Sequence, residues 1–351
     1  MEELTVTREK KYFLGIDIIK FLAMFFVILV HSTTFYGYLY DDSISIIYIF
    51  SSFGRFLSYS CVPLFLIITG YLNSKKQLSF SHYKKIFVYL LEYILCCLVV
   101  WVFRGLIAGE NFSFWQGIIK IFNFSMSEYA WYVSMFIKLF LIIPFLNILY
   151  KALKTKKQKT IFLIILIALI MIPSTIEFLN FGYCDKLYPI FYYFVGLYIH
   201  EFRPNFKKLF LTLFIIAICL LDIVLVRNRG LLSIVLTNYS NVFCMMLSIA
   251  IFLLFYNIPA KDDNNKALSK ITKLSLSTFL VSYIFDRIFI AVLANRGIIS
   301  FADRFVHLIY LVPLNFVFSV ILALFIHLIM NFILDIVGRL NIFITKKFNK
   351  T

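Results

Sequence analysis

The sequence predicts an all-α polytopic membrane protein, and three features lead to that prediction. Apolar residues make up 62% of the 351 positions and charged residues 15%, whereas soluble proteins average about 45–50% and about 25%. Apolar stretches of about twenty residues recur along the chain, each long enough to cross a hydrocarbon core of about 30 Å. The basic residues fall in short clusters between these stretches. Together these features exclude a water-soluble globular domain.

About ten membrane-spanning helices account for the apolar stretches. The stretches are continuously apolar, without the alternation of a membrane β-strand, which excludes a barrel. The first apolar run is too long for a cleavable signal peptide. We expect a cytoplasmic N-terminal tail at 1–12, a transmembrane domain at 13–337 and a basic cytoplasmic C-terminal tail at 338–351. The expected spans are Phe13–Tyr38, Ile44–Leu72, Ile86–Phe103, Ala130–Tyr150, Thr160–Pro173, Tyr188–His200, Leu209–Val226, Leu231–Ile258, Ile271–Asn295 and Phe305–Ile336.

The distribution of basic residues predicts that both termini face the cytoplasm. With the N-terminus inside, about two thirds of the 34 Lys and Arg residues fall in cytoplasmic segments, and the excess alternates from loop to loop, as the positive-inside rule requires. Examples are Lys75-Lys76, Lys84-Lys85 and the run from Lys151 to Lys159. This pattern explains the net charge of +16 without a nucleic-acid partner, which would need a basic face. We expect a multi-pass protein of a bacterial cytoplasmic membrane.

The first span carries three polar groups on one helix face. Asp17 and Lys20 are three residues apart and can pair. Lys20 and His31 are eleven residues apart, which returns to within about 20° of the same direction, about 16 Å further along the axis. An ionisable group at mid-membrane costs about 2.5–3.5 kcal/mol, so each must face protein or water. The alternative is a structural Asp17–Lys20 pair and a His31 that only bonds a neighbouring helix.

Other ionisable groups lie inside later spans. Arg55 and Lys138 need acceptors, which Glu92 and Asp286 can supply. Structural salt bridges are therefore an alternative to a functional role for each of these residues. The six cysteines lie in or beside apolar segments without metal-like spacing, so we expect no metal.

Two more patterns concern packing and recognition. Pro63 predicts a kink in the second span, and Gly70 and Gly196 predict close backbone approach. Trp131 and Tyr132, at the expected outer mouth of the fourth span, can stack on a sugar ring or anchor the helix at the interface. Both alternatives stay open for this aromatic pair.

These motifs resemble those of the membrane-bound acyltransferase type 3 family over about residues 13–335. Asp17, Lys20 and His31 match the family's Asp-x-x-Arg/Lys pattern followed by ten residues and His. Supporting matches are Val62–Leu72, Glu128–Val133 with Ile142–Leu146, and Pro189–Tyr198.

The resemblance implies an enzyme that moves an acyl group, above all acetyl, from cytoplasmic acyl-CoA across the membrane. The acceptor is a hydroxyl of an extracytoplasmic or lipid-linked glycan. His31 acts as general base or transient acyl carrier, and Lys20, held by Asp17, attracts the donor phosphates. The catalytic candidates are therefore His31 and Asp17, the candidates for binding the acyl-CoA are Lys20, Arg55, Lys84 and Lys85, and those for the substrate are Trp131, Tyr132 and Asp286.

The chain also departs from the family pattern. Ser282 stands where many members have His, and Asp286 lies one helix turn further on, so the role of that His is lost or passes to Asp286. No fused esterase-like domain is expected, so transfer falls to the membrane domain or to a separate glycan-assembly or extracytoplasmic partner.

Two other functions compete with the enzyme. A polysaccharide exporter or flippase also fits ten spans with internal charges. An accessory subunit would use the same polar groups to bind partner helices.

Overall fold

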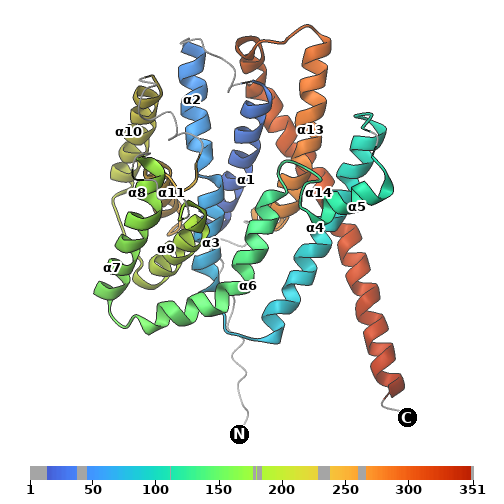
Figure 1. Cartoon of the computed structure of the whole chain (residues 1–351), viewed down its shortest axis with the longest axis horizontal. Helices are drawn as coiled ribbons and strands as arrows, with labels where there is room; N and C mark the ends of the chain where they lie inside the picture. The colour runs from blue at the N-terminus through green and yellow to red at the C-terminus, as the bar shows by residue number, and fades with distance from the viewer. Residues whose placement is uncertain are drawn as a thin grey trace.

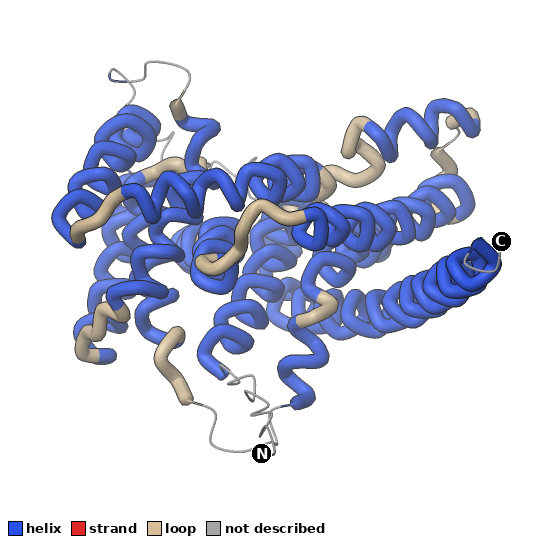
Figure 2. The backbone as a smooth tube through the Cα atoms, turned by 90° about the horizontal axis from the view of Figure 1, so that it is seen from below, coloured by secondary structure: helices blue, strands red, loops and turns tan. Residues whose placement is uncertain are grey.

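The structure, a computed structural model, describes residues 14–37, 46–110, 112–176, 179, 184–227, 238–259 and 266–348. Helices dominate these residues and no strand occurs among them (Figures 1 and 2). The helices are α1 Leu14–Phe35, α2 Ile46–Tyr59, α3 Cys61–Asn73, α4 Phe80–Leu106, α5 Phe114–Phe122, α6 Trp131–Ala152, α7 Lys156–Leu166, α8 Ile172–Thr175, α9 Tyr188–Phe202, α10 Lys208–Arg227, α11 Val242–Phe255, α12 Lys266–Thr272, α13 Ser275–Asn295 and α14 Phe301–Phe348. The predicted all-α class is confirmed.

Within the described residues, seven helical segments are long and apolar enough to cross a membrane. They are Leu14–Phe35, Ile49–Asn73, Phe80–Leu106, Trp131–Ala152, Lys156–Thr175, Ser275–Asn295 and Phe301–Arg339. The other three expected spans overlap α9, α10 and the shorter apolar helix α11. The protein is a multi-pass membrane protein, and the count of ten spans stays a prediction.

The expected second span is divided into α2 and α3, with the break at Ser60. Pro63 has no N–H to donate to the carbonyl of Tyr59, four residues earlier. The thiol of Cys244 on α11 approaches that carbonyl instead, at 3.6 Å. The predicted kink is therefore present, and a neighbouring helix supplies a donor where the proline removed one.

A second proline, Pro144, works in the same way inside α6. It frees the carbonyl of Phe140, which pairs with Nε2 of the buried His82 on α4 at 2.9 Å. The His82 and Phe140 rings also stack, with centroids 4.2 Å apart. The bond fixes the start of α4 against the middle of α6.

Helices α3 and α9 cross at the two predicted small residues. A Cβ on Gly70 would lie 2.0 Å from the carbonyl oxygen of Tyr193, and one on Gly196 would lie 2.2 Å from that of Ile67. Only glycine permits so close an approach. The packing interpretation of Gly70 and Gly196 is confirmed.

The bundle has two ends, which we call the Leu14 end, where α1 begins, and the Phe35 end, where α1 finishes. Figure 1 shows the α3–α4 turn and the end of α14 at the Leu14 end, whereas the α13–α14 turn is at the Phe35 end. Short contacts join segments at the Leu14 end, such as Gly15 N to Ile258 O at 3.2 Å and Asn147 Nδ2 to Lys76 O at 2.8 Å. The predicted cytoplasmic turn α3–α4 thus lies where α1 begins, although the sidedness itself stays a prediction.

Two elements differ from the expected organisation. The short helix α5 was not anticipated, although Ser113 and Gln116 form the capping box that begins it, a signal readable from sequence. Helix α14 continues to Phe348, past the expected end of the transmembrane domain at 337, and Figure 2 shows it extending away from the other helices. The expected tail at 1–12 lies outside the described residues.

Candidate active site

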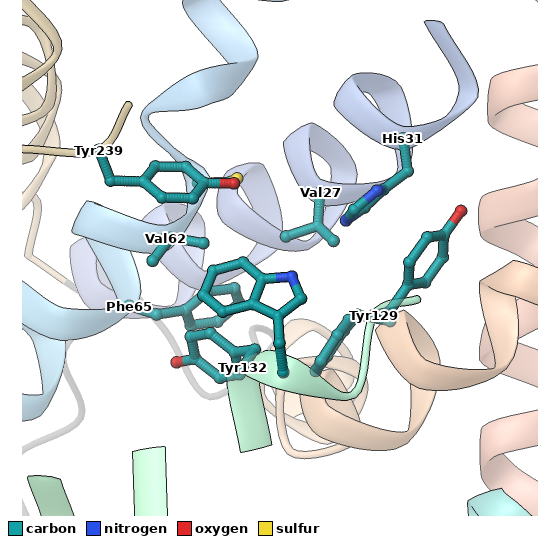
Figure 3. A pocket seen from close by; sticks show the side chains of 10 residues that line it. Val27, His31, Val62, Phe65, Tyr129, Tyr132 and Tyr239 are labelled. Carbon is teal, nitrogen blue, oxygen red and sulfur yellow. The ribbon is translucent and has the colours of Figure 1, made fainter. Parts of the chain in front are cut away.

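His31, near the end of α1, faces a small chamber between α1, α3, α6 and α13 (Figure 3). The chamber has a volume of about 20 Å³. The imidazole stacks on Tyr129, with ring centroids 3.8 Å apart and planes inclined by 27°. The chamber is lined by Val27, His31, Cys61, Val62, Phe65, Tyr129, Trp131, Tyr132, Tyr239 and Phe279. The imidazole therefore faces a space lined by side chains of the protein.

Lys20 lines a second, larger cavity, of about 230 Å³. Its ammonium lies 3.2 Å from Oδ1 of Asp17, and the hydroxyl of Thr272 on α12 donates to the same oxygen at 2.9 Å. The cavity also contacts Asn73 and Ser275, the last residue of α3 and the first of α13. It therefore reaches the Leu14 end of the bundle, with a cation on its wall.

Three aromatic side chains form walls of both cavities, and we call them the shared rings: Phe65, Tyr132 and Phe279. They come from α3, α6 and α13. The Tyr132 ring contacts the other two, with centroids 6.1 Å from Phe65 and 5.5 Å from Phe279. The stripe on α1 thus faces two cavities that meet at a single aromatic layer.

A buried carboxylate lies behind the chamber. Asp286 on α13 is fully buried and accepts hydrogen bonds from Ser32 Oγ at 2.5 Å and Tyr129 Oη at 2.6 Å. Ser32 follows His31 on α1, and Tyr129 stacks on it. Asp286 lines neither cavity. It therefore contacts the neighbours of His31, namely Ser32 and Tyr129, and not the space in which a substrate would lie.

Arg55 lies at the other end of α1 from Lys20. Its guanidinium donates to the carbonyl of Val30 at 3.2 Å and to the hydroxyls of Thr33 at 3.0 Å and Thr34 at 2.7 Å. It also lines a separate groove between α1, α2 and α14. The structure therefore does not bring Arg55 to the cavity of Lys20, where the prediction of donor binding would need it.

Lys84 and Lys85 are exposed on the first turns of α4, and neither lines a cavity described above. The structure therefore does not bring them to the cavity of Lys20.

The partners of the buried carboxylates differ from the basic residues that were expected. Glu92 accepts from the backbone N–H and the hydroxyl of Ser277, at 3.2 and 2.5 Å, and Lys138 is exposed. Hydroxyl groups thus satisfy the carboxylates that were expected to form salt bridges.

The other predicted site residues divide between the two cavities. Trp131 lines the chamber, and Tyr132 lines both spaces, so neither is confined to an outer mouth. Asp17 is fourteen residues from His31, or about 21 Å along the axis. It contacts Lys20 and Thr272, and is therefore a positioning residue for Lys20 and cannot touch His31.

Sequence reasoning missed the partners that complete the site. Thr272 and the shared ring Phe279 carry no distinguishing signal, because hydroxyls and aromatic residues are frequent in all the spans. Ser32 follows His31, and Phe65 lies in the family-like stretch Val62–Leu72, but neither position revealed its contacts. Tyr129 stands directly before Ala130-Trp131 in a segment that matches the family pattern, so its position was marked but its contacts were not. No group of three or more His, Cys, Asp or Glu side chains is placed to hold a metal within the described residues.

A family model described as an acyltransferase domain matches residues 13–331. No curated protein and no solved structure matches the chain. The match covers nearly the whole chain and includes both cavities with Asp17, Lys20 and His31. The chain belongs to the acyltransferase type 3 family and is a multi-pass membrane acyltransferase.

Proposed function

We propose that this acyltransferase moves an acetyl group from acetyl-CoA in the bacterial cytoplasm to a hydroxyl of an extracytoplasmic or lipid-linked glycan. The observation that carries the proposal is the stripe on α1, because Lys20 and His31 face adjoining cavities that share one aromatic layer. A cation beside the larger cavity suits an anionic donor, and an imidazole beside the smaller one suits proton transfer.

The proposed chemical step takes place at His31. Its imidazole accepts the proton of the acceptor hydroxyl as the hydroxyl oxygen attacks the thioester carbonyl. A C–O bond forms, the C–S bond breaks, and the CoA thiolate takes the proton from the imidazolium. The Tyr129 ring, stacked at 3.8 Å, holds the imidazole in one orientation.

The donor enters from the Leu14 end in this proposal. The ammonium of Lys20 attracts the phosphates of CoA, while Asp17 holds that ammonium through a contact of 3.2 Å. Thr272 holds Asp17 in turn, because its hydroxyl donates to the carboxylate at 2.9 Å. The thioester must then extend about 16 Å along α1 to reach His31. The acceptor reaches the chamber from the opposite side, as a glycan substrate or with a glycan-assembly partner.

The test is transfer of labelled acetyl from acetyl-CoA to the glycan of membrane vesicles that contain the full chain. We expect His31→Ala to reduce transfer by at least about 100-fold, since general acid–base groups contribute about 10²–10⁴-fold. The matched control is His307→Ala, because His307 lies near the start of α14 and contacts Tyr310 instead of the chamber. Near-normal transfer by His31→Ala, in protein inserted at the normal level, would remove His31 from the mechanism.

Lys20 is tested in the same assay. Lys20→Ala should raise the donor KM by about tenfold, the equivalent of one charge-assisted hydrogen bond, and Lys20→Arg should keep the donor KM close to normal. An unchanged donor KM in Lys20→Ala would show that the donor binds elsewhere.

A deletion strain separates the enzyme from the exporter. Loss of acetyl esters with a normal amount of surface polymer supports the acyltransferase proposal. Loss of the polymer itself supports export and contradicts the proposal.

A further inference from the structure

The chamber beside His31 is an order of magnitude smaller than the cavity beside Lys20, at about 20 Å³ against about 230 Å³. A cavity needs about 10–15 Å³ by this measure to hold one water molecule. The chamber therefore has room for one group the size of a methyl or a water, with little space to spare. The cavity beside Lys20 has room for many more.

The walls of the chamber are part of the tightly packed interior. Val27 and Val62 are 6% and 4% exposed, and both belong to the main apolar core. The Trp131 and Tyr239 rings stack with centroids 5.8 Å apart, and the Tyr132 ring contacts Trp131 at 6.2 Å. Close-packed interiors yield little to an added methylene, which costs about 1–3 kcal/mol when it is forced into them. The part of the chamber wall that Val27 and Val62 form is therefore nearly fixed in position.

We infer that this chamber limits the length of the transferred acyl chain, and that Val27 and Val62 are specificity-determining residues that restrict it to acetyl. The inference rests on the proposed function, because a thioester carbonyl that reaches His31 must place its alkyl group in the chamber. A methyl group fits the space, whereas each further methylene meets a packed side chain.

The size difference between the cavities makes the limit apply to transfer and not to donor binding. A longer acyl group fits within the cavity beside Lys20, where CoA would be held, but cannot advance past the shared rings Phe65, Tyr132 and Phe279 into the chamber. Longer acyl-CoA molecules should therefore bind as competitors of acetyl-CoA without being transferred.

The first experiment uses the unmodified protein in membrane vesicles, with labelled acetyl-, propionyl- and butyryl-CoA as donors. Apolar pockets discriminate one methylene by about 10–200-fold. We expect kcat/KM to fall by at least about tenfold from acetyl to propionyl, and again from propionyl to butyryl. Butyryl-CoA should inhibit acetyl transfer with a Ki close to the KM of acetyl-CoA. Equal transfer of butyryl and acetyl would overturn the inference.

The second experiment enlarges the chamber with the double variant Val27→Ala/Val62→Ala. Its ratio of butyryl to acetyl transfer should rise by at least about tenfold over the wild-type ratio. The matched control is Val133→Ala, a valine on α6 that is 1% exposed and lies outside both cavity walls, and its ratio should not change. A wild-type ratio in an active double variant would overturn the assignment of the two valines.

The outcomes separate this inference from the proposed function. Absence of transfer from every donor by the wild-type protein contradicts the proposed function, and the inference with it. Acetyl transfer with no chain-length preference contradicts the inference alone. Because the donor series needs no substitution, it decides the question even if the double variant does not fold.

Discussion

The cavity of Lys20 and the chamber of His31 share an aromatic layer but differ in size and in the polar group on their walls. The first is large, reaches the end of the bundle, and has a partly exposed ammonium whose side chain is 25% accessible. The second is small, ringed by aromatic side chains, and holds an imidazole stacked on Tyr129. Lys20 and His31 lie on one face of α1, so a single helix contributes one polar residue to each of the two cavities.

This difference indicates a division between binding and chemistry. Large cavities with few polar groups bury most of a ligand and suit binding. Small, tightly packed sites hold reacting groups in one geometry, where a displacement of 1 Å can cost about 100-fold in rate. Changes around the chamber should therefore affect kcat, and changes around Lys20 should affect the donor KM.

After His31→Ala, the largest effect is expected from Asp286→Ala. The change removes the acceptor for Ser32 and Tyr129, whose bonds of 2.5 and 2.6 Å hold the ring against His31. We expect kcat to fall by about 100-fold while the donor KM stays within about twofold. Asp286→Asn, which keeps an acceptor oxygen, should restore part of the lost rate. The measurement is steady-state transfer of acetyl over a range of acetyl-CoA concentrations.

Glu92→Ala is the matched control for Asp286. Glu92 is also a buried carboxylate bonded to hydroxyl and backbone groups, but its partner is Ser277 and it lines neither cavity. It should lower thermal stability without a comparable fall in kcat. If both variants lost rate to the same extent, the effect of Asp286 would be one of stability, and the division between the cavities would lose its support.

The sequence was sufficient to predict the long apolar helices and the stripe on α1, because both follow from local periodicity. Apolar stretches of about twenty residues give the spans, and the spacing of Asp17, Lys20 and His31 gives the common face. Pro63 likewise acts on its own helix, which made the kink predictable. Gly70 indicated a close approach to another helix but not which one, because its neighbour Tyr193 is on α9. These features depend on few contacts distant in sequence.

The site's partners could not be predicted because they come from distant parts of the chain. Tyr129 and Asp286 are separated by 157 positions, and Asp17 and Thr272 by 255. Arg55 could not be placed from its charge alone, since its contacts depend on how α2 packs against the end of α1. With 19% of residues aromatic, no pattern marks Phe279 as a wall shared by two cavities.

A smaller effect is expected at the layer between the cavities, from Phe279→Ala. Removal of this ring opens the chamber to the cavity of Lys20, and exclusion of water is one way in which enzymes prevent hydrolysis of reactive donors. We expect hydrolysis of acetyl-CoA without acceptor to rise by about tenfold, measured as release of CoA thiol. Water attacks the thioester carbonyl in that reaction, a C–O bond forms, the C–S bond breaks, CoA leaves as the thiol, and acetate and a proton are the other products.

The loss of a buried phenyl ring also costs about 3–5 kcal/mol, so the variant needs a control for destabilisation. Phe191→Ala removes an equally buried ring on α9, away from both cavities. It should lower stability without raising hydrolysis. Equal hydrolysis in Phe279→Ala and wild type would mean that Phe279 does not separate the two spaces.

The smallest effect is expected from Thr272→Val, which tests the Lys20 side of the comparison. The change removes the hydroxyl that donates to Asp17 at 2.9 Å but leaves the Asp17–Lys20 contact and nearly the same side-chain volume. One hydrogen bond contributes about 0.5–1.5 kcal/mol, so the donor KM should rise by about two- to fivefold with kcat unchanged. Thr160→Val is the control, because its hydroxyl pairs with Tyr198 at 3.0 Å, between α7 and α9, and its donor KM should stay normal. A fall in kcat at constant KM in Thr272→Val would mean that Asp17 serves the chemical step, and the two cavities would then act as one site.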